Sequence, residues 1–115
     1  MKIETNVENE IAIVKLDGRF DAHHAATVKA NMLHLIEVNT PKLVVNLAAV
    51  NFIDSAGLAV LVQAMKRCRE AGGELRLCHL QTSVVVILEM SGLDKALAIH
   101  EDEAAAATAF AAIPA

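Results

Sequence analysis

The fold is decided by residues 43–73, which read LVVNLAAVNFIDSAGLAVLVQAMKRCREAGG. The apolar run Leu43–Leu47 is typical of a strand covered on both faces. We expect residues 48–53 to be a connection and Asp54-Ser55 to open a helix, because both residue types are preferred helix N-caps. Gly72-Gly73 would end that helix. Its predicted buried stripe consists of Leu58, Leu61, Val62, Met65 and Cys68.

The residues before this unit predict a β-hairpin followed by a helix. Apolar and polar side chains alternate over Lys2–Val7 and again over Ile11–Leu16. Asp17-Gly18 would end the second strand. Asp21 is a good N-cap, and apolar residues recur at helical spacing over Ala22–Glu37.

Further strands and helices are predicted after residue 73. They are a strand over Glu74–Leu80, a short helix capped by Thr82 or Ser83 and running through Met90 to Gly92, a strand over Ala96–Ile99, and an Ala-rich helix opened by Asp102 that carries Phe110 and Ile113.

Strands that alternate with helices in this way predict an α/β fold with right-handed βαβ units. We therefore expect one domain over residues 1–115, with a mixed, mostly parallel sheet, an antiparallel N-terminal hairpin and about four helices. A chain of 115 residues is long enough to bury a core of its own.

Composition and charge exclude several classes of function. The formal net charge of −4 counts against a nucleic-acid-binding protein. The basic cluster of Lys66, Arg67 and Arg69 lies where a helix should end, and there it complements the helix dipole. No apolar run is long enough to cross a membrane, and the first residues lack the apolar core of a signal peptide. We expect a cytoplasmic protein.

The sequence does not predict an enzyme. It contains neither a phosphate-binding GxxxxGK[ST] loop nor a dinucleotide-binding GxGxxG motif. Ser55 is flanked by Ile53 and Gly57, not by the two glycines of a nucleophile elbow. The five histidines lack the spacing of metal ligands on one helix face, and Cys68 and Cys78 are expected to be small buried hydrophobes. We expect no cofactor and no metal.

The pair Asp54-Ser55 has two interpretations. Both residues are common helix N-caps, so the pair can be purely structural. In the other interpretation, Ser55 is presented beside free backbone N–H groups at a helix N-terminus, which suits a phosphate. The carboxyl of Asp54 would then repel that phosphate as a like charge.

The segment Phe52-Ile53-Asp54-Ser55-Ala56-Gly57-Leu58 resembles the signature of the bacterial anti-sigma factor antagonists, in the STAS domain family. The resemblance covers nearly the whole chain. It includes the opening hairpin, residues 16–21 before the first helix, the strand from Leu75, and Ser91-Gly92-Leu93.

This resemblance implies a regulatory protein-binding module. Ser55 would be phosphorylated by a GHKL-type serine kinase that also serves as the anti-sigma factor. Phosphorylation would break the complex, and a metal-dependent serine phosphatase would restore the antagonist. The matching positions are Asp54 and Ser55, with Asp21 at the acidic position near the phosphoserine. Where some relatives have a second hydroxyl, this chain has Ala56.

The apolar residues around Ser55 are candidates for packing against the partner: Phe52, Leu58 and Ala56. Leu58 is equally well explained as a core residue. An alternative function is a STAS scaffold that is not phosphorylated, in a signalling assembly or a lipid-transport complex. The apolar segment Val84–Leu88 would then be an exposed docking patch, although a buried helix also explains it.

Overall fold

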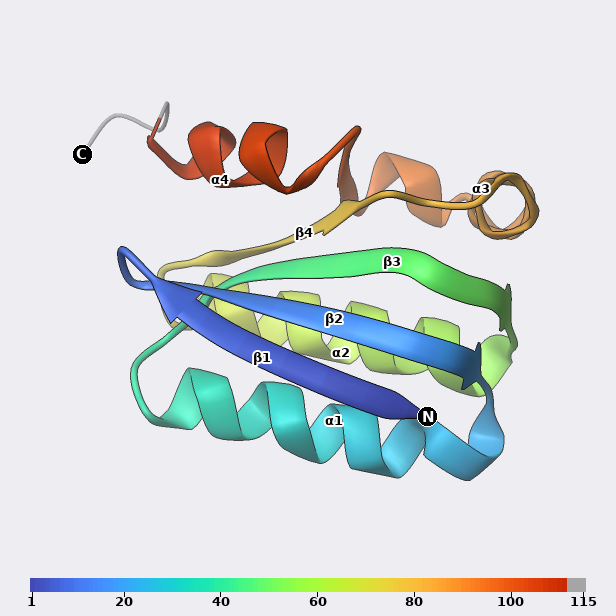
Figure 1. The fold of residues 1–115 in the computed structure, drawn as a ribbon, viewed down its shortest axis with the longest axis horizontal. Helices are drawn as coiled ribbons and strands as arrows, with labels where there is room; N and C mark the ends of the chain where they lie inside the picture. The colour runs from blue at the N-terminus through green and yellow to red at the C-terminus, as the bar shows by residue number, and fades with distance from the viewer. Residues whose placement is uncertain (112–115) are drawn as a thin grey trace.

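Five strands form one sheet with helices on both faces (Figure 1). The computed structural model describes residues 1–111. Strand β1 is antiparallel to β2, and each following pair is parallel, which confirms the predicted mixed sheet with an N-terminal hairpin. In their order across the sheet, the strands are β1 (Lys2–Glu8), β2 (Ile11–Phe20), β3 (Lys42–Ile53), β4 (Glu74–Cys78) and β5 (Ala98–His100).

The predicted helices are also present. They are α1 (Ala22–Glu37), α2 (Ser55–Glu70), α3 (Thr82–Ser91) and α4 (Glu103–Ala111), with a short 3₁₀ turn over Leu93–Lys95 between α3 and β5. Helices α1 and α2 cover one face of the sheet, and α4 lies on the other (Figure 1). Helix α3 lies beyond the end of β4 and buries Val84 and Leu88 in the larger core.

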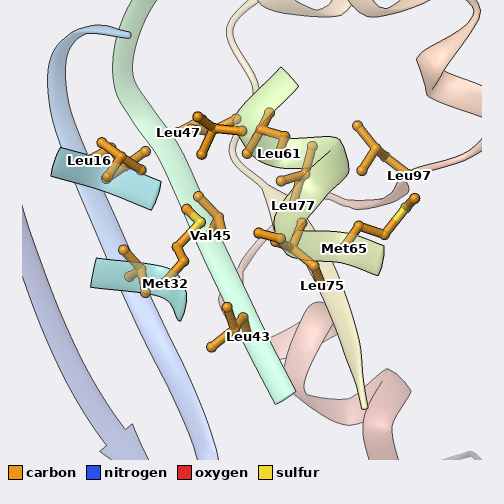
Figure 2. Packing of buried hydrophobic residues seen from close by; sticks show 14 of the residues in the cluster. Leu16, Met32, Leu43, Val45, Leu47, Leu61, Met65, Leu75, Leu77 and Leu97 are labelled. Carbon is orange, nitrogen blue, oxygen red and sulfur yellow. The ribbon is translucent and has the colours of Figure 1, made fainter. Parts of the chain in front are cut away.

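Alternation along the strands divides the core between the two faces. Leu43, Val45 and Leu47 of β3 point toward α1 and α2, whereas Val44 points toward α4. Figure 2 shows the larger cluster, in which Met32 of α1 and Leu61 of α2 pack against the strands. The smaller cluster under α4 is built from Val44, Cys78, Ala106 and Phe110.

Strands β2 and β3 are longer than predicted. Strand β2 continues through Asp17-Gly18 to Phe20, so the predicted break there is wrong, as is the predicted connection at residues 48–53. Lys15 pairs with Asn46 but Asp17 pairs with Ala49, so β3 carries an extra residue at this step. A bulge of this kind keeps two strands paired although the apolar pattern is interrupted.

Three shorter elements also differ from expectation. Strand β4 ends at Cys78, before His79 with its positive φ of 55°. Helix α3 follows Gln81 without a side-chain cap, and the Ser83 hydroxyl donates instead to the backbone oxygen of Asn51 at 3.1 Å. The 3₁₀ turn delays β5 to Ala98–His100. The Asp102 cap is confirmed by its 2.8 Å bond from the Ala105 N–H, while Ile113 lies outside the described residues.

Candidate phosphorylation and partner-binding site

Helices α1 and α2 begin side by side because they follow paired strands. Phe20 ends β2 and pairs with Ile53, the last residue of β3. Each strand is followed by an aspartate that serves as the N-cap of the next helix, Asp21 for α1 and Asp54 for α2. Both predicted caps are confirmed. Ser55 is the first residue of α2 and is exposed.

Asp54 connects the starts of the two helices. Its Oδ1 accepts from the N–H groups of Ala56 at 2.9 Å and Gly57 at 3.0 Å, as a cap does. Its Oδ2 accepts from the N–H of Ala22, the first residue of α1, at 3.0 Å. One carboxyl group therefore satisfies backbone donors on two helices and fixes their relative position at this edge of the sheet.

These bonds correct one prediction about Ser55. The backbone N–H groups of Ala56 and Gly57 are not free, because Asp54 Oδ1 occupies both. The N–H of Leu58 donates to the Asp54 carbonyl at 3.0 Å. A phosphate on Ser55 would have to displace Asp54 to reach the N–H groups of Ala56 and Gly57. With the present bonds intact, such a phosphate would lie at the surface beside an acidic side chain.

Gly57 lets α2 approach the end of β2. A Cβ at this position would lie 2.5 Å from the Phe20 carbonyl oxygen and 2.8 Å from Ile53 Cγ1, closer than packed atoms tolerate. Only glycine fits between this turn and the strand ends. The position of Ser55 therefore depends on a close backbone contact two residues further along.

Arg19 covers Phe52 at the rim of the site. These two residues are paired across β2 and β3, and the guanidinium carbon lies 3.9 Å from the centre of the phenyl ring. Arg19 Nε is 3.7 Å from Asp21 Oδ2. Phe52, predicted as an apolar partner contact, is half-buried beneath a cation. A partner would meet the guanidinium together with the ring.

His24 is held by Asp21. Its Nδ1 lies 2.8 Å from Asp21 Oδ1 and 3.0 Å from the Arg19 carbonyl oxygen. Both neighbours are acceptors, so Nδ1 carries the hydrogen. Desolvation raises the pKa of Asp21, but the hydrogen bond and charge of His24 and the His23 N–H outweigh it and hold this pKa below its usual value.

The structure thus brings most of the predicted site residues to one edge of the sheet. Asp21, Asp54 and Ser55 lie where α1 and α2 begin, and Phe52 lies at the end of β3. Ala56 and Leu58 are both half-buried in α2. Sequence reasoning missed Arg19 and His24. Their signal was their closeness in sequence to Asp21, because Arg19 is the second-last residue of β2 and His24 lies in the first turn of α1.

The two cysteine thiols are poorly suited to ionise. Cys68 and Cys78 are both buried and unpaired, as predicted. Burial, with the charge of Glu74, raises the pKa of Cys68 to about 12, and burial, with the charges of Glu103 and Asp102, raises that of Cys78 to about 11. Within residues 1–111, no group of three or more His, Cys, Asp or Glu side chains could hold a metal. No helix in that range is long and apolar enough to cross a membrane.

Comparison with known proteins identifies the family. The model of the STAS domain family matches residues 2–106. The anti-sigma F factor antagonist of Paenibacillus polymyxa is 32% identical over 109 residues, which cover 94% of this chain and 93% of that relative. This chain therefore belongs to the STAS domain family. Curated relatives that are similar over nearly its whole length are anti-sigma factor antagonists.

Solved structures confirm the STAS fold at lower sequence identity. A Thermotoga maritima protein matches with a TM-score of 0.90 and 20% identity, covering 95% of this chain and 94% of its own. The Bacillus cell fate determinant SpoIIAA in its phosphorylated form matches with a TM-score of 0.73 and 19% identity. That match covers 94% of this chain and 99% of SpoIIAA.

Proposed function

We propose that this chain is an anti-sigma factor antagonist controlled by phosphorylation of Ser55. It acts in the cytoplasm as one regulatory domain over residues 1–115 and is not an enzyme. Unphosphorylated, it binds an anti-sigma factor that is also a GHKL-type serine kinase, and the sigma factor is released. Phosphorylation ends this binding, and a metal-dependent serine phosphatase reverses it.

One observation carries the proposal: Ser55 is exposed at the start of α2, directly after its acidic cap Asp54, and the start of α1, capped by Asp21, lies alongside. A kinase can reach this hydroxyl without unfolding the domain. Phe52, Ala56 and Leu58 provide partly apolar surface around it for a partner. The curated relatives named as antagonists and the phosphorylated structure of SpoIIAA support the same function.

The physical effect of phosphorylation follows from the bonds of Asp54. A phosphoserine adds about −1.5 to −2 charges at neutral pH. Because Asp54 already accepts from the N–H groups of Ala56 and Gly57, the new charge stays at the surface, where the partner binds. There it adds repulsion and a desolvation cost. A loss of about 1.4 kcal/mol weakens binding tenfold.

A second candidate is a STAS scaffold with a permanent partner. Helix α3 favours it, because Val86 is 47% exposed and Met90 is 83% exposed. The segment Val84–Leu88 is thus only partly the patch that this alternative requires, since Val84 and Leu88 are buried. A scaffold of this kind would bind its partner equally well when Ser55 is replaced by aspartate.

Mass spectrometry tests the proposed function. We would incubate the protein and its Ser55→Ala variant with ATP and a soluble extract of the host, and then map the peptides. The expected result is one phosphate on Ser55, absent from the variant. No phosphate in an extract that modifies a known antagonist would contradict the proposal and favour the scaffold.

A further inference from the structure

Strand β1 forms an open edge of the sheet. It is the first strand in the order across the sheet, and among residues 1–111 it pairs only with β2 (Figure 1). It is seven residues long, contains no proline and pairs with β2 without a register shift. The strand at the opposite edge, β5, has only three residues. Sheets commonly protect an edge by a short strand, a bulge or a proline, and β1 has none of these three protections.

The hairpin turn determines which backbone groups of β1 face the open edge. Asn9 and Glu10 both have positive φ, of 52° and 67°, as in a two-residue type I′ turn. The residues that flank such a turn, here Glu8 and Ile11, are hydrogen-bonded to each other. Hydrogen-bonded and non-hydrogen-bonded pairs then alternate along the two strands. The N–H and C=O groups that point away from β2 therefore belong to Ile3, Thr5 and Val7.

These open groups match the same groups of a second copy. A two-fold axis through Thr5 would place Ile3 of each chain opposite Val7 of the other chain, and Thr5 opposite Thr5. Each of these pairs would exchange two backbone hydrogen bonds. The side chain of Val7 is 51% exposed, and the half-buried Ile3 of the second copy would lie beside it. Apolar pairs of this kind stabilise a sheet.

The charged side chains of β1 favour this register over its neighbours. On the other face of the strand, the register places Lys2 opposite Glu8 of the second copy, and Glu4 opposite Asn6. A shift by two residues in one direction would place Glu4 opposite Glu4, and a shift in the other direction would place Glu4 opposite Glu8. Opposite charges that face each other across strands stabilise a sheet, and like charges destabilise it. The order of charges along β1 is therefore complementary to itself in the antiparallel direction.

The contacts that these side chains make within one chain are exposed and can be exchanged. Lys2 Nζ lies 3.1 Å from Glu4 Oε1, with the two side chains 71% and 58% exposed. Asn6 Nδ2 donates to Glu8 Oε1 at 3.2 Å, also at the surface. Exposed contacts of this kind contribute little to stability, so replacing them by contacts between two chains has a small cost.

We propose that β1 pairs with β1 of a second copy, antiparallel about Thr5, to form a dimer with one continuous sheet. One pair of strands is a small interface, so the dimer is weak and its population depends on concentration. The interface does not include Ser55, and the inference therefore goes beyond the proposed function and does not depend on it. Each dimer carries two Ser55 sites.

A proline at position 5 tests the backbone contacts. Thr5→Pro removes an N–H group that faces the open edge and none that bonds β2, which is where edge strands accept proline. Thr5→Val keeps the N–H group and a β-branched side chain, so it is the matched control. Sedimentation equilibrium from about 10 µM to about 1 mM would measure dimerisation of the 12.3 kDa chain. We expect Thr5→Pro to weaken dimerisation at least about tenfold, and Thr5→Val less than about threefold.

Charge reversal tests the register. Glu8→Lys alone places two positive side chains opposite each other, and Lys2→Glu alone places two negative ones. Because this pair occurs twice in the dimer, each variant should weaken dimerisation at least about tenfold. The double variant Lys2→Glu/Glu8→Lys restores opposite charges and should dimerise within about threefold of the wild type. Glu10→Lys makes the same change of charge in the exposed turn, outside the paired strand, and should have little effect.

Three results would overturn the inference: a wild-type chain that stays monomeric at about 1 mM, a dimer that Thr5→Pro does not weaken, or single charge variants whose effect the double variant does not reverse. Circular dichroism would check that each variant folds, and the charge variants carry the test if Thr5→Pro does not fold. None of these results bears on phosphorylation of Ser55, so the proposed function stands or fails separately.

Discussion

At the scale of single residues, the site depends most on Asp54. This side chain caps α2 through Ala56 and Gly57 and also bonds Ala22 of α1. In an anti-sigma factor antagonist, an aspartate beside the modified serine would ordinarily be explained by repulsion of phosphate. Here it has a structural task as well, because it holds the serine-bearing helix against its neighbour.

Graded substitution of Asp54 should separate its bond to Ala22 of α1 from its cap bonds to Ala56 and Gly57 of α2. Asp54→Asn keeps one oxygen for the α2 cap but presents an NH₂ group to the Ala22 N–H, and should cost about 1 kcal/mol of unfolding free energy. Asp54→Ala removes both contacts and should cost about 2–3 kcal/mol. Urea unfolding measures these values. The control Asp17→Asn changes an exposed aspartate, and the account fails if Asp54→Ala is no less stable than this control.

At the scale of elements, the close contact at Gly57 determines where α2 begins. An alanine in a helix normally stabilises it by up to about 1 kcal/mol relative to glycine. Gly57→Ala should do the opposite and cost about 1–3 kcal/mol, because its Cβ would meet the Phe20 carbonyl oxygen at 2.5 Å. Thermal unfolding shows whether the Gly57→Ala variant is less or more stable than the wild type. An increase in stability would show that the first turn of α2 is free to shift.

The helices could be predicted from sequence better than the strands. The bounds of α1 are those expected, because Asp21 caps a regular apolar period. The buried face of α2 was predicted less well, because Leu58 and Val62 are half-exposed. Apolar residues occupy nearly every side of its first turns, and the period does not select one. The second half of β3 was missed because bulges, which depend on β2, break its pattern.

The site itself was predictable in part. Asp54 and Ser55 stand out in the sequence, but the bond from Ala22 to Asp54 joins residues 32 positions apart. That contact follows from the parallel pairing of β2 with β3, which local patterns do not determine. Arg19 over Phe52 has the same origin, because the two face each other only in this register.

At the scale of the whole molecule, the pair of Arg76 and His100 beside the small cluster under α4 should make stability depend on pH. Arg76 lies over Phe110, with its guanidinium carbon 4.7 Å from the ring centre, and Arg76 Nη1 is 3.3 Å from His100 Nε2. Burial, with the charge of Arg76, lowers the pKa of His100 from its ordinary 6.5. The folded state therefore favours neutral His100.

This lowered pKa predicts a loss of stability on acidification. Well above pH 6.5, His100 is neutral in both the folded and the unfolded state, so its titration costs the folded state no stability. As the pH falls below this value, the unfolded state binds the proton first, so folding loses free energy until the folded His100 also titrates. We expect His100→Asn to lose less unfolding free energy than the wild type between pH 7 and pH 5. Equal losses in parallel urea titrations would contradict the assignment.

The central claim is that phosphate on Ser55 controls binding to the anti-sigma kinase. The most direct test is the affinity of one purified host kinase of this class for the unmodified chain and for the chain phosphorylated at Ser55, measured side by side. The account predicts that phosphorylation weakens binding at least tenfold, about 1.4 kcal/mol, without changing the far-ultraviolet circular dichroism. Equal affinity for the two forms would contradict it.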